Sequence, residues 1–270
     1  MNCKICTHPT EKIFSKKILL KYDADYFRCT NCGFMQTEEP FWLKEAYNSA
    51  ITSLDIGILD RNKFLLREIP KIIDSCFPEG QIFLDFAGGY GLFVRSMRDL
   101  GFNFFRQDFF CENIFANHFD LEDSATKQFD AVTAFEVFEH LENPLPEIEN
   151  ILSYSENIIF STDIIPDDEK IEDWIYIAHE TGQHIAFYTE KSLRIVAEKF
   201  GKNYYRKKNL HVFTNKTFTQ EQLDYAFHDN DLKKDFWGTI KKKNKKFSIR
   251  RESYQHRDYL KIKEILKRNA

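Results

Sequence analysis

The sequence predicts an α/β fold built on a doubly wound, mostly parallel sheet of seven strands. Short apolar runs alternate with segments of helical periodicity between residues 61 and 218, as in parallel strands joined by crossover helices. Within that pattern, residues 83–93 (FLDFAGGYGLF) pass from an apolar run through three glycines into a second apolar stretch, which predicts a strand, a tight turn and a helix start. With 270 residues, 43% of them hydrophobic and 16% aromatic, the chain can form one main domain with appendages.

Seven segments fit the strands of this sheet, and four fit its helices. The strands are expected at residues 81–86, 103–105, 113–118, 131–136, 157–161, 203–206 and 210–213. The helices are expected at residues 64–73, 91–100, 144–152 and 191–200. Pro70 should kink or split the first helix, Pro144 opens the third, and Gly201 ends the last. Ligands in such sheets bind beyond the carboxyl ends of the strands, so the residues that follow each strand are the candidate site.

The segments outside the predicted sheet differ from it in composition. We divide the chain into a cysteine-bearing module (1–40), a connecting helix or lid (41–60), a core domain (61–218) and a basic helical C-terminal extension (219–270). From residue 232 onward, 14 Lys and Arg against 4 Asp and Glu give +10, whereas 24 against 38 give −14 for the rest. The basic run at 241–246 has three interpretations: a solvated surface, a grip on acceptor phosphates or, with Phe247, Tyr254 and Tyr259 interleaved, RNA binding.

Four of the six cysteines form two Cys-x-x-Cys pairs, Cys3 with Cys6 and Cys29 with Cys32, with 22 residues between them. Four thiolates at this spacing match a tetrahedral zinc site, which would be structural because no coordination position is open. The alternatives are incidental pairs or a site that has lost its metal. Because we find no secretory signal and no apolar run near the roughly 20 residues of a spanning helix, we expect the cytosol, where cysteines stay reduced.

The glycine turn is expected to bind a nucleotide-type ligand. Glycines let backbone N–H groups approach a ligand closely, and the following helix N-terminus offers unpaired donors. A dinucleotide fingerprint would need glycine where the bulky Val94 stands, so NAD is disfavoured. Asp108 lies 23 residues after Asp85, at the end of the second predicted strand, where a carboxylate can accept both hydroxyls of a ribose. The alternative for Asp108 is a solvated turn aspartate.

The glycine turn, with the acids and the apolar strand that follow it, resembles class I S-adenosylmethionine-dependent methyltransferases, whose Rossmann-like domain has a first motif of roughly Leu-Asp-x-Gly-x-Gly-x-Gly. The resemblance covers about residues 61–214 and departs at Ala87, which costs little if φ there is negative. It implies S-adenosylmethionine as cofactor, with its methionine part over Gly89 and Gly91. The cofactor-binding residues that it implies are Asp85, Ala87, Gly88, Gly89, Tyr90, Gly91, Asp108, Phe109, Phe135 and Glu136. Methyltransferases that act on sugars often look like this, with an N-terminal zinc-binding domain.

Two further segments carry the candidate catalytic residues. The resemblance places the strand end of the first beside the donor, and the second is expected to face the acceptor. Residues 135–141 (FEVFEHL) resemble the Glu-x-x-Glu-His element of many small-molecule methyltransferases, and they lack the Asp/Asn-Pro-Pro-aromatic signature of enzymes that methylate nucleic-acid amino groups. Residues 174–188 resemble a branch of methyltransferases linked to sugars and bacterial surface polysaccharides. We predict His184 first and His140 second as the base that takes a hydroxyl proton, with Glu180 as a third catalytic residue. For each histidine a structural or capping role is an equal alternative.

We therefore predict a methyltransferase that O-methylates a small or sugar-linked acceptor in the biosynthesis of a bacterial-type surface polysaccharide such as capsule or lipopolysaccharide. An acceptor oxygen that is already anionic, as in a phosphate or phosphoramidate, would need no base. The alternatives are an RNA methyltransferase that uses the zinc module and basic tail, and a noncatalytic zinc-bearing interaction module. Nucleic acid is not the expected partner. The acceptor, the methylated atom and the oligomeric state stay open, as does whether Tyr47, Asp55 and Arg61 close over the donor.

Overall fold

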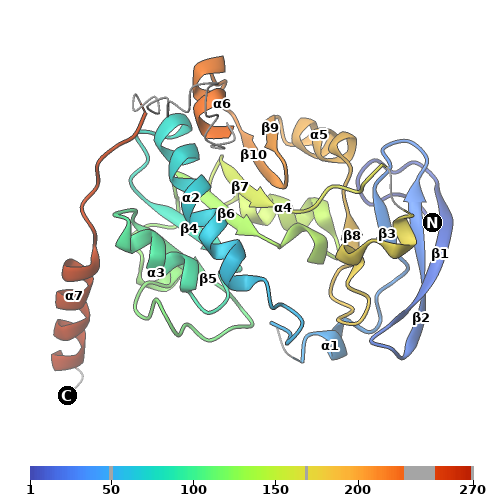
Figure 1. The fold of residues 1–270 in the computed structure, drawn as a ribbon, viewed down its shortest axis with the longest axis horizontal. Coiled ribbons are helices and arrows are strands. Elements are labelled where there is room, and N and C mark those ends of the chain that lie inside the picture. The colour runs from blue at the N-terminus through green and yellow to red at the C-terminus, as the bar shows by residue number, and fades with distance from the viewer. Residues whose placement is uncertain (49–50, 168–169, 228–246, 269–270) are drawn as a thin grey trace, which may run out of the picture.

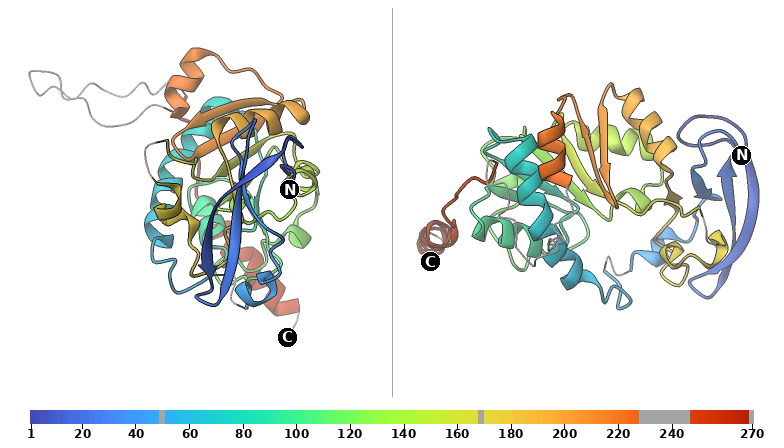
Figure 2. Two further views of the ribbon diagram at one scale, coloured as in Figure 1. Left: turned by 90° about the vertical axis from the view of Figure 1, so that its right-hand side faces the viewer. Right: turned by 45° about the horizontal axis from the view of Figure 1, so that its top comes forward.

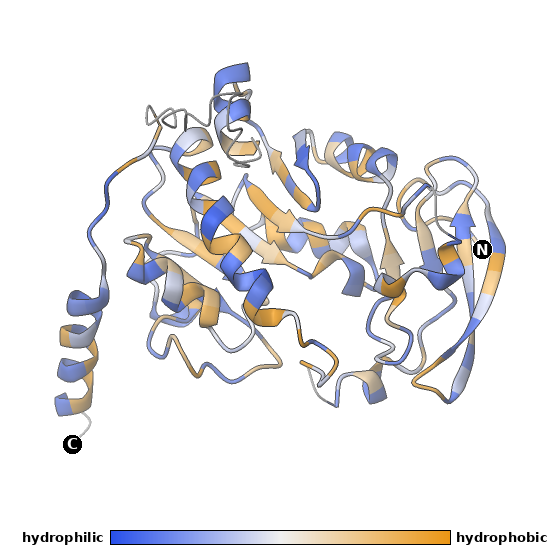
Figure 3. Ribbon diagram, viewed as in Figure 1, coloured by the Kyte–Doolittle hydropathy of each residue, from blue (hydrophilic) through white to orange (hydrophobic). Residues whose placement is uncertain are grey.

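The computed structural model describes residues 1–48, 51–167, 170–227 and 247–268, and its centre is a mixed six-stranded sheet of order β5-β4-β6-β7-β10-β9 (Figure 1). The strands are β4 (Phe83–Phe86), β5 (Phe104–Gln107), β6 (Ala131–Phe135), β7 (Ile158–Ser161), β9 (Asn203–Lys207) and β10 (Leu210–Thr214). β5, β4, β6 and β7 are parallel, and β10 and β9 form the antiparallel hairpin. Apolar residues concentrate along the central strands (Figure 3), because helices cover both faces of the sheet. The predicted α/β class is confirmed.

The prediction of a seventh strand at residues 113–118 is wrong, because the sheet in the described part of the chain has six strands. This segment is a loop beside the glycine turn. Asn113 Oδ1 accepts the N–H of Ala116 at 2.9 Å, and Asn113 Nδ2 donates to the Ala116 carbonyl at 2.7 Å. The next two N–H groups after Asn113 donate to the Tyr90 carbonyl, at 3.1 and 3.0 Å. The asparagine side chain and the turn thus take hydrogen bonds that a strand would exchange with a neighbouring strand.

Helices lie on both faces of the central sheet, and Figure 2 shows α2 and α4 on opposite sides. The helices are α1 (Leu43–Ala46), α2 (Ile58–Cys76), α3 (Leu92–Asp99), α4 (Pro144–Leu152), α5 (Glu190–Lys199), α6 (Gln220–Phe227) and α7 (Gln255–Arg268). α2 runs through Pro70 as one helix of 19 residues, so the proline does not split it. Burial of its apolar side, which includes Ile69 and Ile72 at 0% exposure, offsets the hydrogen bond that a proline removes.

A second sheet, of order β1-β2-β3-β8, contains the N-terminal segment (Figure 1). Its strands are β1 (Thr10–Ile18), β2 (Tyr22–Cys29), β3 (Met35–Thr37) and β8 (Ala186–Phe187). β3 and β8 are antiparallel, with Met35 opposite Phe187. A second apolar core lies under this sheet and contains the buried side chains of Tyr26, Trp42 and Trp174. The residues that precede β8 are therefore fixed to the N-terminal module.

The last helix, α7, docks on α3 through a buried ion pair. Arg98 donates to both carboxylate oxygens of Asp258 at 2.7 Å, and each of the two residues is 2% exposed. Of the predicted extension, α6 and α7 lie within the described residues, whereas the basic run at 241–246 lies outside them. Among the helices of the described segments, none combines the length and the apolar character that crossing a membrane requires.

His211 in β10 is a buried neutral histidine that should make the fold sensitive to acid. Its Nε2–H donates to the Thr162 carbonyl at 3.0 Å, its Nδ1 accepts the Tyr204 hydroxyl at 2.9 Å, and burial lowers its pKa to about 4. The unfolded chain takes up this proton near pH 6.5, so the wild type loses stability as the pH falls from 6.5 to 4. We expect the free energy of unfolding of the wild type, relative to His211→Gln, to fall by about 3 kcal/mol between pH 7 and pH 4 in urea titrations. An equal pH dependence of the two proteins would contradict this expectation.

Candidate active site

The glycine turn between β4 and α3 lies at the carboxyl edge of the parallel strands, where the sequence predicted it. Gly89 and Gly91 have positive φ angles of 54° and 83°. A Cβ at Gly91 would lie 2.6 Å from Asn113 Oδ1, and a Cβ at Gly88 would lie 2.7 Å from Asp85 Oδ2. Any side chain at Gly88 or Gly91 would therefore collide with a neighbour, so the turn depends on glycine at both positions.

Ala87 has a φ of 54°, so the condition under which alanine would cost little at this position is not met. A left-handed conformation costs a residue with a Cβ roughly 1–2 kcal/mol, which glycine avoids. We expect Ala87→Gly to raise the free energy of unfolding by about 1 kcal/mol in urea titrations. Ala197→Gly, inside helix α5, is the control and should lower it by about the same amount. Destabilisation by Ala87→Gly would contradict the strain argument.

Asp85 lies beneath the turn and is 3% exposed. Burial raises its pKa to about 7, although the hydroxyl of Thr133 donates to Oδ1 at 2.6 Å and lowers it, while the charge of Asp108 raises it further. Because Gly88 packs against its second oxygen, Asp85 supports the turn from inside the sheet.

Asp108 follows β5 and holds the turn from above. Its Oδ2 accepts the N–H of Gly89 at 2.9 Å, and its Oδ1 accepts the N–H groups of Phe110 and Cys111 at 2.8 and 2.7 Å. A carboxylate offers about four acceptor positions, and these three bonds leave one position for a ribose hydroxyl. The sequence predicted that Asp108 accepts both ribose hydroxyls. Arg106, 5% exposed, donates to the Gly89 carbonyl and makes a 2.7 Å ion pair with Asp120.

Aromatic side chains surround the turn. Phe109 is 80% exposed, whereas Phe110 stacks on Tyr47 with ring centroids 5.4 Å apart. Phe135, at the end of β6, makes an edge contact with Phe93 at 5.0 Å. Tyr47 comes from the predicted lid segment, which thus reaches over the residues after β5.

The lid segment also contacts the acceptor side of the candidate site. The Tyr47 ring lies 6.3 Å from that of His140, and the carbonyl of Ala46 accepts the side-chain amide of Gln183 at 2.9 Å. Arg61 and Asp55 form a two-pronged ion pair, with N···O distances of 3.1 and 2.7 Å. Tyr47 and Ala46 therefore contact both the residues beside the glycine turn and the segment that carries His184.

Two glutamates follow β6. Glu136 has a φ of 53° and its Oε1 accepts the Ser161 hydroxyl at 2.5 Å. Glu139 is 0% exposed, and neither of its carboxylate oxygens has a hydrogen-bond partner in the described part of the chain. Burial raises the pKa of each glutamate to about 7. The hydroxyls of Tyr176 and Thr162 lie close enough to lower the pKa of Glu139, but outside hydrogen-bond geometry.

His140 and His184 meet beside Glu139, with ring centroids 4.9 Å apart. His140 Nδ1 lies 3.1 Å from the Gln183 carbonyl, and His184 Nδ1 lies 2.6 Å from the Tyr176 carbonyl. A carbonyl only accepts, so each Nδ1 carries the proton and each Nε2 keeps its lone pair. Burial lowers the pKa of both rings, that of His140 to about 3, so both are neutral at physiological pH.

Glu180 lies apart from this cluster. It is exposed and approaches the Nε2 of His179, at 3.4 Å, while the Nδ1 of His179 bonds the carbonyl of Lys17. The structure thus brings together two of the three predicted catalytic residues and places the third in the contact between the 178–182 loop and the N-terminal sheet.

The four predicted metal ligands converge at the base of the N-terminal sheet. The Sγ–Sγ distances are 3.6 Å for Cys3–Cys32, 3.4 Å for Cys6–Cys29 and 3.5 Å for Cys6–Cys32. Tetrahedral Zn–S bonds of about 2.3 Å imply roughly 3.8 Å between sulfurs, so the cluster fits zinc, while a disulfide needs about 2.05 Å. Backbone N–H groups of Ile5, Asn31 and Cys32 point at cluster sulfurs at 3.4 Å each, as expected for thiolates.

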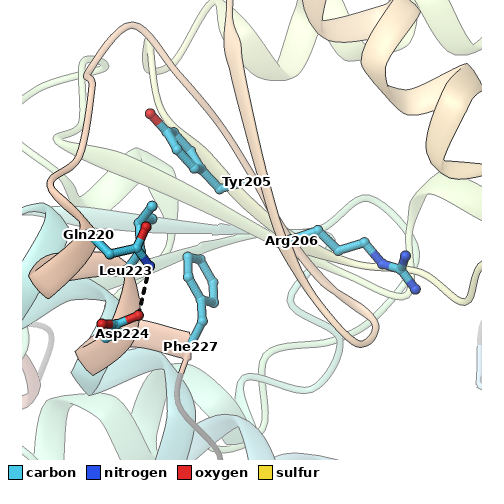
Figure 4. Close-up of a pocket in the computed structure, with 6 residues that line it drawn as sticks. All are labelled: Tyr205, Arg206, Gln220, Leu223, Asp224 and Phe227. Carbon is cyan, nitrogen blue, oxygen red and sulfur yellow. Dashed lines mark hydrogen bonds between the residues drawn. The ribbon is translucent and has the colours of Figure 1, made fainter.

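A separate hollow lies between α6 and β9 (Figure 4). Its lining residues are Tyr205, Arg206, Gln220, Leu223, Asp224 and Phe227. Tyr205 and Arg206 point to opposite sides of β9, and Gln220 donates to Asp224 at 2.8 Å (Figure 4). None of the acids, histidines or glycines described above lines this hollow, so the candidate active site is at the carboxyl edge of the parallel strands.

Four residues of the site were not selected from the sequence: Arg106, Thr133, Glu139 and Gln183. Arg106 follows two phenylalanines in β5, and Thr133 is the one polar residue of β6; a polar residue in a buried strand signals a buried partner. Glu139 stands within the Glu-x-x-Glu-His element, next to a selected histidine. Gln183 stands within the segment 174–188, but its contacts, a backbone carbonyl to His140 and a side-chain amide to Ala46, depend on the folded chain.

Three comparisons with known proteins were made. A family model described as a methyltransferase domain matches residues 59–207, more than half of the chain. The search of curated proteins found no match to this chain. Solved structures with a similar fold include the mitomycin 7-O-methyltransferase MmcR (11% identity over 63% of this chain and 59% of that one, TM-score 0.42). A second is magnesium protoporphyrin IX methyltransferase (ChlM) from Synechocystis PCC 6803 with bound SAH (12% identity over 63% of this chain and 90% of that one, TM-score 0.43). A third is the plantazolicin methyltransferase BpumL in complex with SAH (13% identity over 66% of this chain and 95% of that one, TM-score 0.43). This chain thus spans 59% of the length of the mitomycin enzyme.

Proposed function

Since this chain belongs to the methyltransferase domain family and is an S-adenosylmethionine-dependent methyltransferase, we propose that it methylates a hydroxyl oxygen of a small or sugar-linked acceptor. The observation that carries the proposal is the pair of neutral histidines, His140 and His184, whose free Nε2 atoms lie beside the strand ends that follow the glycine turn. A neutral imidazole next to the donor is suited to an acceptor that must lose a proton.

The donor is proposed to lie over the glycine turn, with its methionine part against Gly89 and Gly91. Asp108 would accept one ribose hydroxyl at its remaining acceptor position, and a second bond would require one of its backbone contacts to open. Phe110, which stacks on Tyr47, offers an aromatic face to the adenine ring. Asp85, Ala87, Gly88 and Tyr90 would act by shaping this turn, and Phe109, Phe135 and Glu136 would border it.

Methyl transfer is proposed as an in-line displacement. The acceptor oxygen forms a bond to the methyl carbon as the carbon–sulfur bond breaks, the sulfur keeps the electron pair, and S-adenosylhomocysteine is released. The hydroxyl proton passes to an imidazole Nε2, first that of His184 and second that of His140. Holding donor and acceptor in line supplies up to roughly 7–11 kcal/mol of the barrier reduction, and the base adds about 10²–10⁴-fold.

Three finer features belong to this proposal. The four-cysteine cluster would hold a structural zinc, as its sulfur spacing supports. The acceptor would belong to a surface-polysaccharide pathway of bacterial type, which rests on the resemblance of the 174–188 segment. The enzyme would work in the cytosol, where the cysteines stay reduced.

The test is a transfer assay with the full chain and S-adenosylmethionine carrying an isotopically labelled methyl group. Nucleoside diphosphate sugars and phosphorylated monosaccharides are the acceptors to screen. We expect S-adenosylhomocysteine and a product whose NMR shift places the label on oxygen. A label on nitrogen or carbon would contradict the proposal, as would turnover of RNA in preference to every sugar.

A further inference from the structure

The side chains of Glu139, His140 and His184 form a second group of metal-ligating type, separate from the four-cysteine cluster. One atom from each, a carboxylate oxygen or a ring nitrogen, lies within 4.8 Å of the others. Glu139 and His140 come from the short 3-10 helix Phe138–His140, and His184 comes from the segment before β8. We infer that these three residues bind a divalent transition-metal cation that activates the acceptor hydroxyl; this inference rests on the proposed function and replaces its histidine base.

Both imidazoles are oriented as metal ligands. Each Nδ1–H donates to a backbone carbonyl, that of Gln183 for His140 and that of Tyr176 for His184. This outer hydrogen bond fixes the tautomer and leaves Nε2 as the coordinating atom, as in most metal-bound histidines.

Glu139 supplies an independent observation. Its side chain is 0% exposed, and neither carboxylate oxygen has a hydrogen-bond partner of acceptable geometry in the described residues. An unpaired buried carboxylate is costly, and a cation bound between it and the two imidazoles would satisfy it. The orphaned carboxylate is next to the free lone pairs of the two rings, so all three face the same point.

The charges around this cluster favour a cation. Glu136 and Asp163 both interact electrostatically with His184. Among the described residues, Arg61 is a cation whose charge acts on both rings, and its guanidinium already forms a two-pronged pair with Asp55. Three carboxyl groups, those of Glu136, Glu139 and Asp163, therefore lie near the two neutral rings, whereas Arg61 contributes a single positive charge.

The ligand set selects the class of metal. Two imidazoles and one carboxylate suit Mn²⁺, Fe²⁺ or Zn²⁺, and three protein ligands leave coordination positions open for water or substrate. The four cysteines are a softer, closed set. Mn²⁺ therefore distinguishes the two sites, since thiolates bind it poorly.

The bound cation would change how the acceptor loses its proton. The acceptor hydroxyl would occupy an open position, where the positive charge lowers its pKa and its proton leaves to water. The resulting oxygen would attack the methyl carbon, while the sulfur takes the electron pair of the broken bond. His140 and His184 would act as ligands in this step.

The test uses Mn²⁺ as the probe, with the full chain and its cysteine cluster loaded with zinc. Free Mn²⁺ is followed by its EPR signal. We expect one Mn²⁺ to bind per chain, and the dissociation constant to rise at least about 100-fold in Glu139→Gln, because a lost ligand costs more than a lost outer-shell partner. Glu147→Gln changes a carboxylate outside the cluster and should bind Mn²⁺ as the wild type does.

S-adenosylhomocysteine affinity, measured on the same variants, separates the possible failures. Unchanged affinity shows that Glu139→Gln is folded, and His140→Gln is the second variant if it is not. Absence of Mn²⁺ binding, or equal binding by wild type and both variants, overturns the metal site. Chelator-resistant methyl transfer overturns it while the proposed function stands. Mn²⁺ binding lost in Glu139→Gln, in a protein that binds no S-adenosyl compound, supports the site and refutes the proposed function.

Discussion

If the four-cysteine cluster holds the proposed zinc ion, Cys32→Ser is expected to abolish its binding and, with it, the order of the N-terminal sheet. Structural zinc sites contribute about 10–16 kcal/mol of apparent binding free energy, which is comparable with the whole stability of an ordinary domain, about 5–15 kcal/mol. The cluster is also a structural support for β8. The Cys32 carbonyl accepts the Thr189 hydroxyl at 2.6 Å, and the Asn31 carbonyl accepts the ammonium of Lys191.

Loss of this support should reach the acceptor side. β8 begins two residues after His184, and Ile185 donates its N–H to the Glu139 carbonyl at 2.9 Å. We therefore expect Cys32→Ser to lose methyl transfer together with the zinc. Metal analysis and amide exchange of β1, β2 and β8 measure the effect. Cys111→Ser changes a cysteine outside the cluster and should keep both metal binding and methyl transfer. A Cys32→Ser protein with wild-type exchange protection in β8 would show that the metal does not hold this region.

Gly91→Ala is expected to lower the affinity for S-adenosylhomocysteine by tenfold or more, an increase of at least about 1.4 kcal/mol in binding free energy. The added Cβ would meet Asn113 Oδ1 at 2.6 Å and the Ala116 backbone nitrogen at 3.2 Å, so the loop beside the turn must move. The left-handed φ of 83° adds a strain of roughly 1–2 kcal/mol.

Gly201→Ala is the matched control for this change. Gly201 has a φ of 63°, but a Cβ there would meet no atom within 4 Å. Both variants therefore carry similar backbone strain, and only Gly91→Ala displaces the loop. Calorimetric titration should give wild-type affinity for Gly201→Ala. Equal affinities for the two variants would mean that the turn does not form the donor site.

The central strands could be predicted from the sequence because they are buried on both faces. β6 and β7 are mostly apolar, interrupted only by Thr133 and Ser161, and their residues Val132, Ala134, Ile158 and Ile159 are 0% exposed. The glycine turn and the paired cysteines were equally visible, since each is a local pattern with a fixed spacing.

Features that depend on distant contacts could not be predicted. Residues 113–118 are apolar enough for a strand, but the side chain of Asn113 closes them into a loop. β8 has two residues and exists because β3, about 150 positions earlier, pairs with it. Neither the loop closed by Asn113 nor the pairing of β3 with β8 can be inferred from local periodicity.

The candidate site shows the same division. The motif around Glu136 marked the donor side, whereas the meeting of His140 with His184 depends on the path of the chain between them. The three hydrogen bonds that backbone N–H groups donate to the Asp108 carboxylate also depend on the folded loop. The positive φ of Ala87 was missed because most residues with a Cβ avoid it.

Calorimetric titration of the full chain with S-adenosylhomocysteine, repeated with Asp108→Asn, tests the proposed donor site most directly. The proposed site predicts micromolar binding by the wild type and a loss of at least tenfold in the variant, because the amide replaces one acceptor oxygen with a donor. No binding by the wild type, or equal binding by both proteins, would contradict the placement of the donor over the glycine turn.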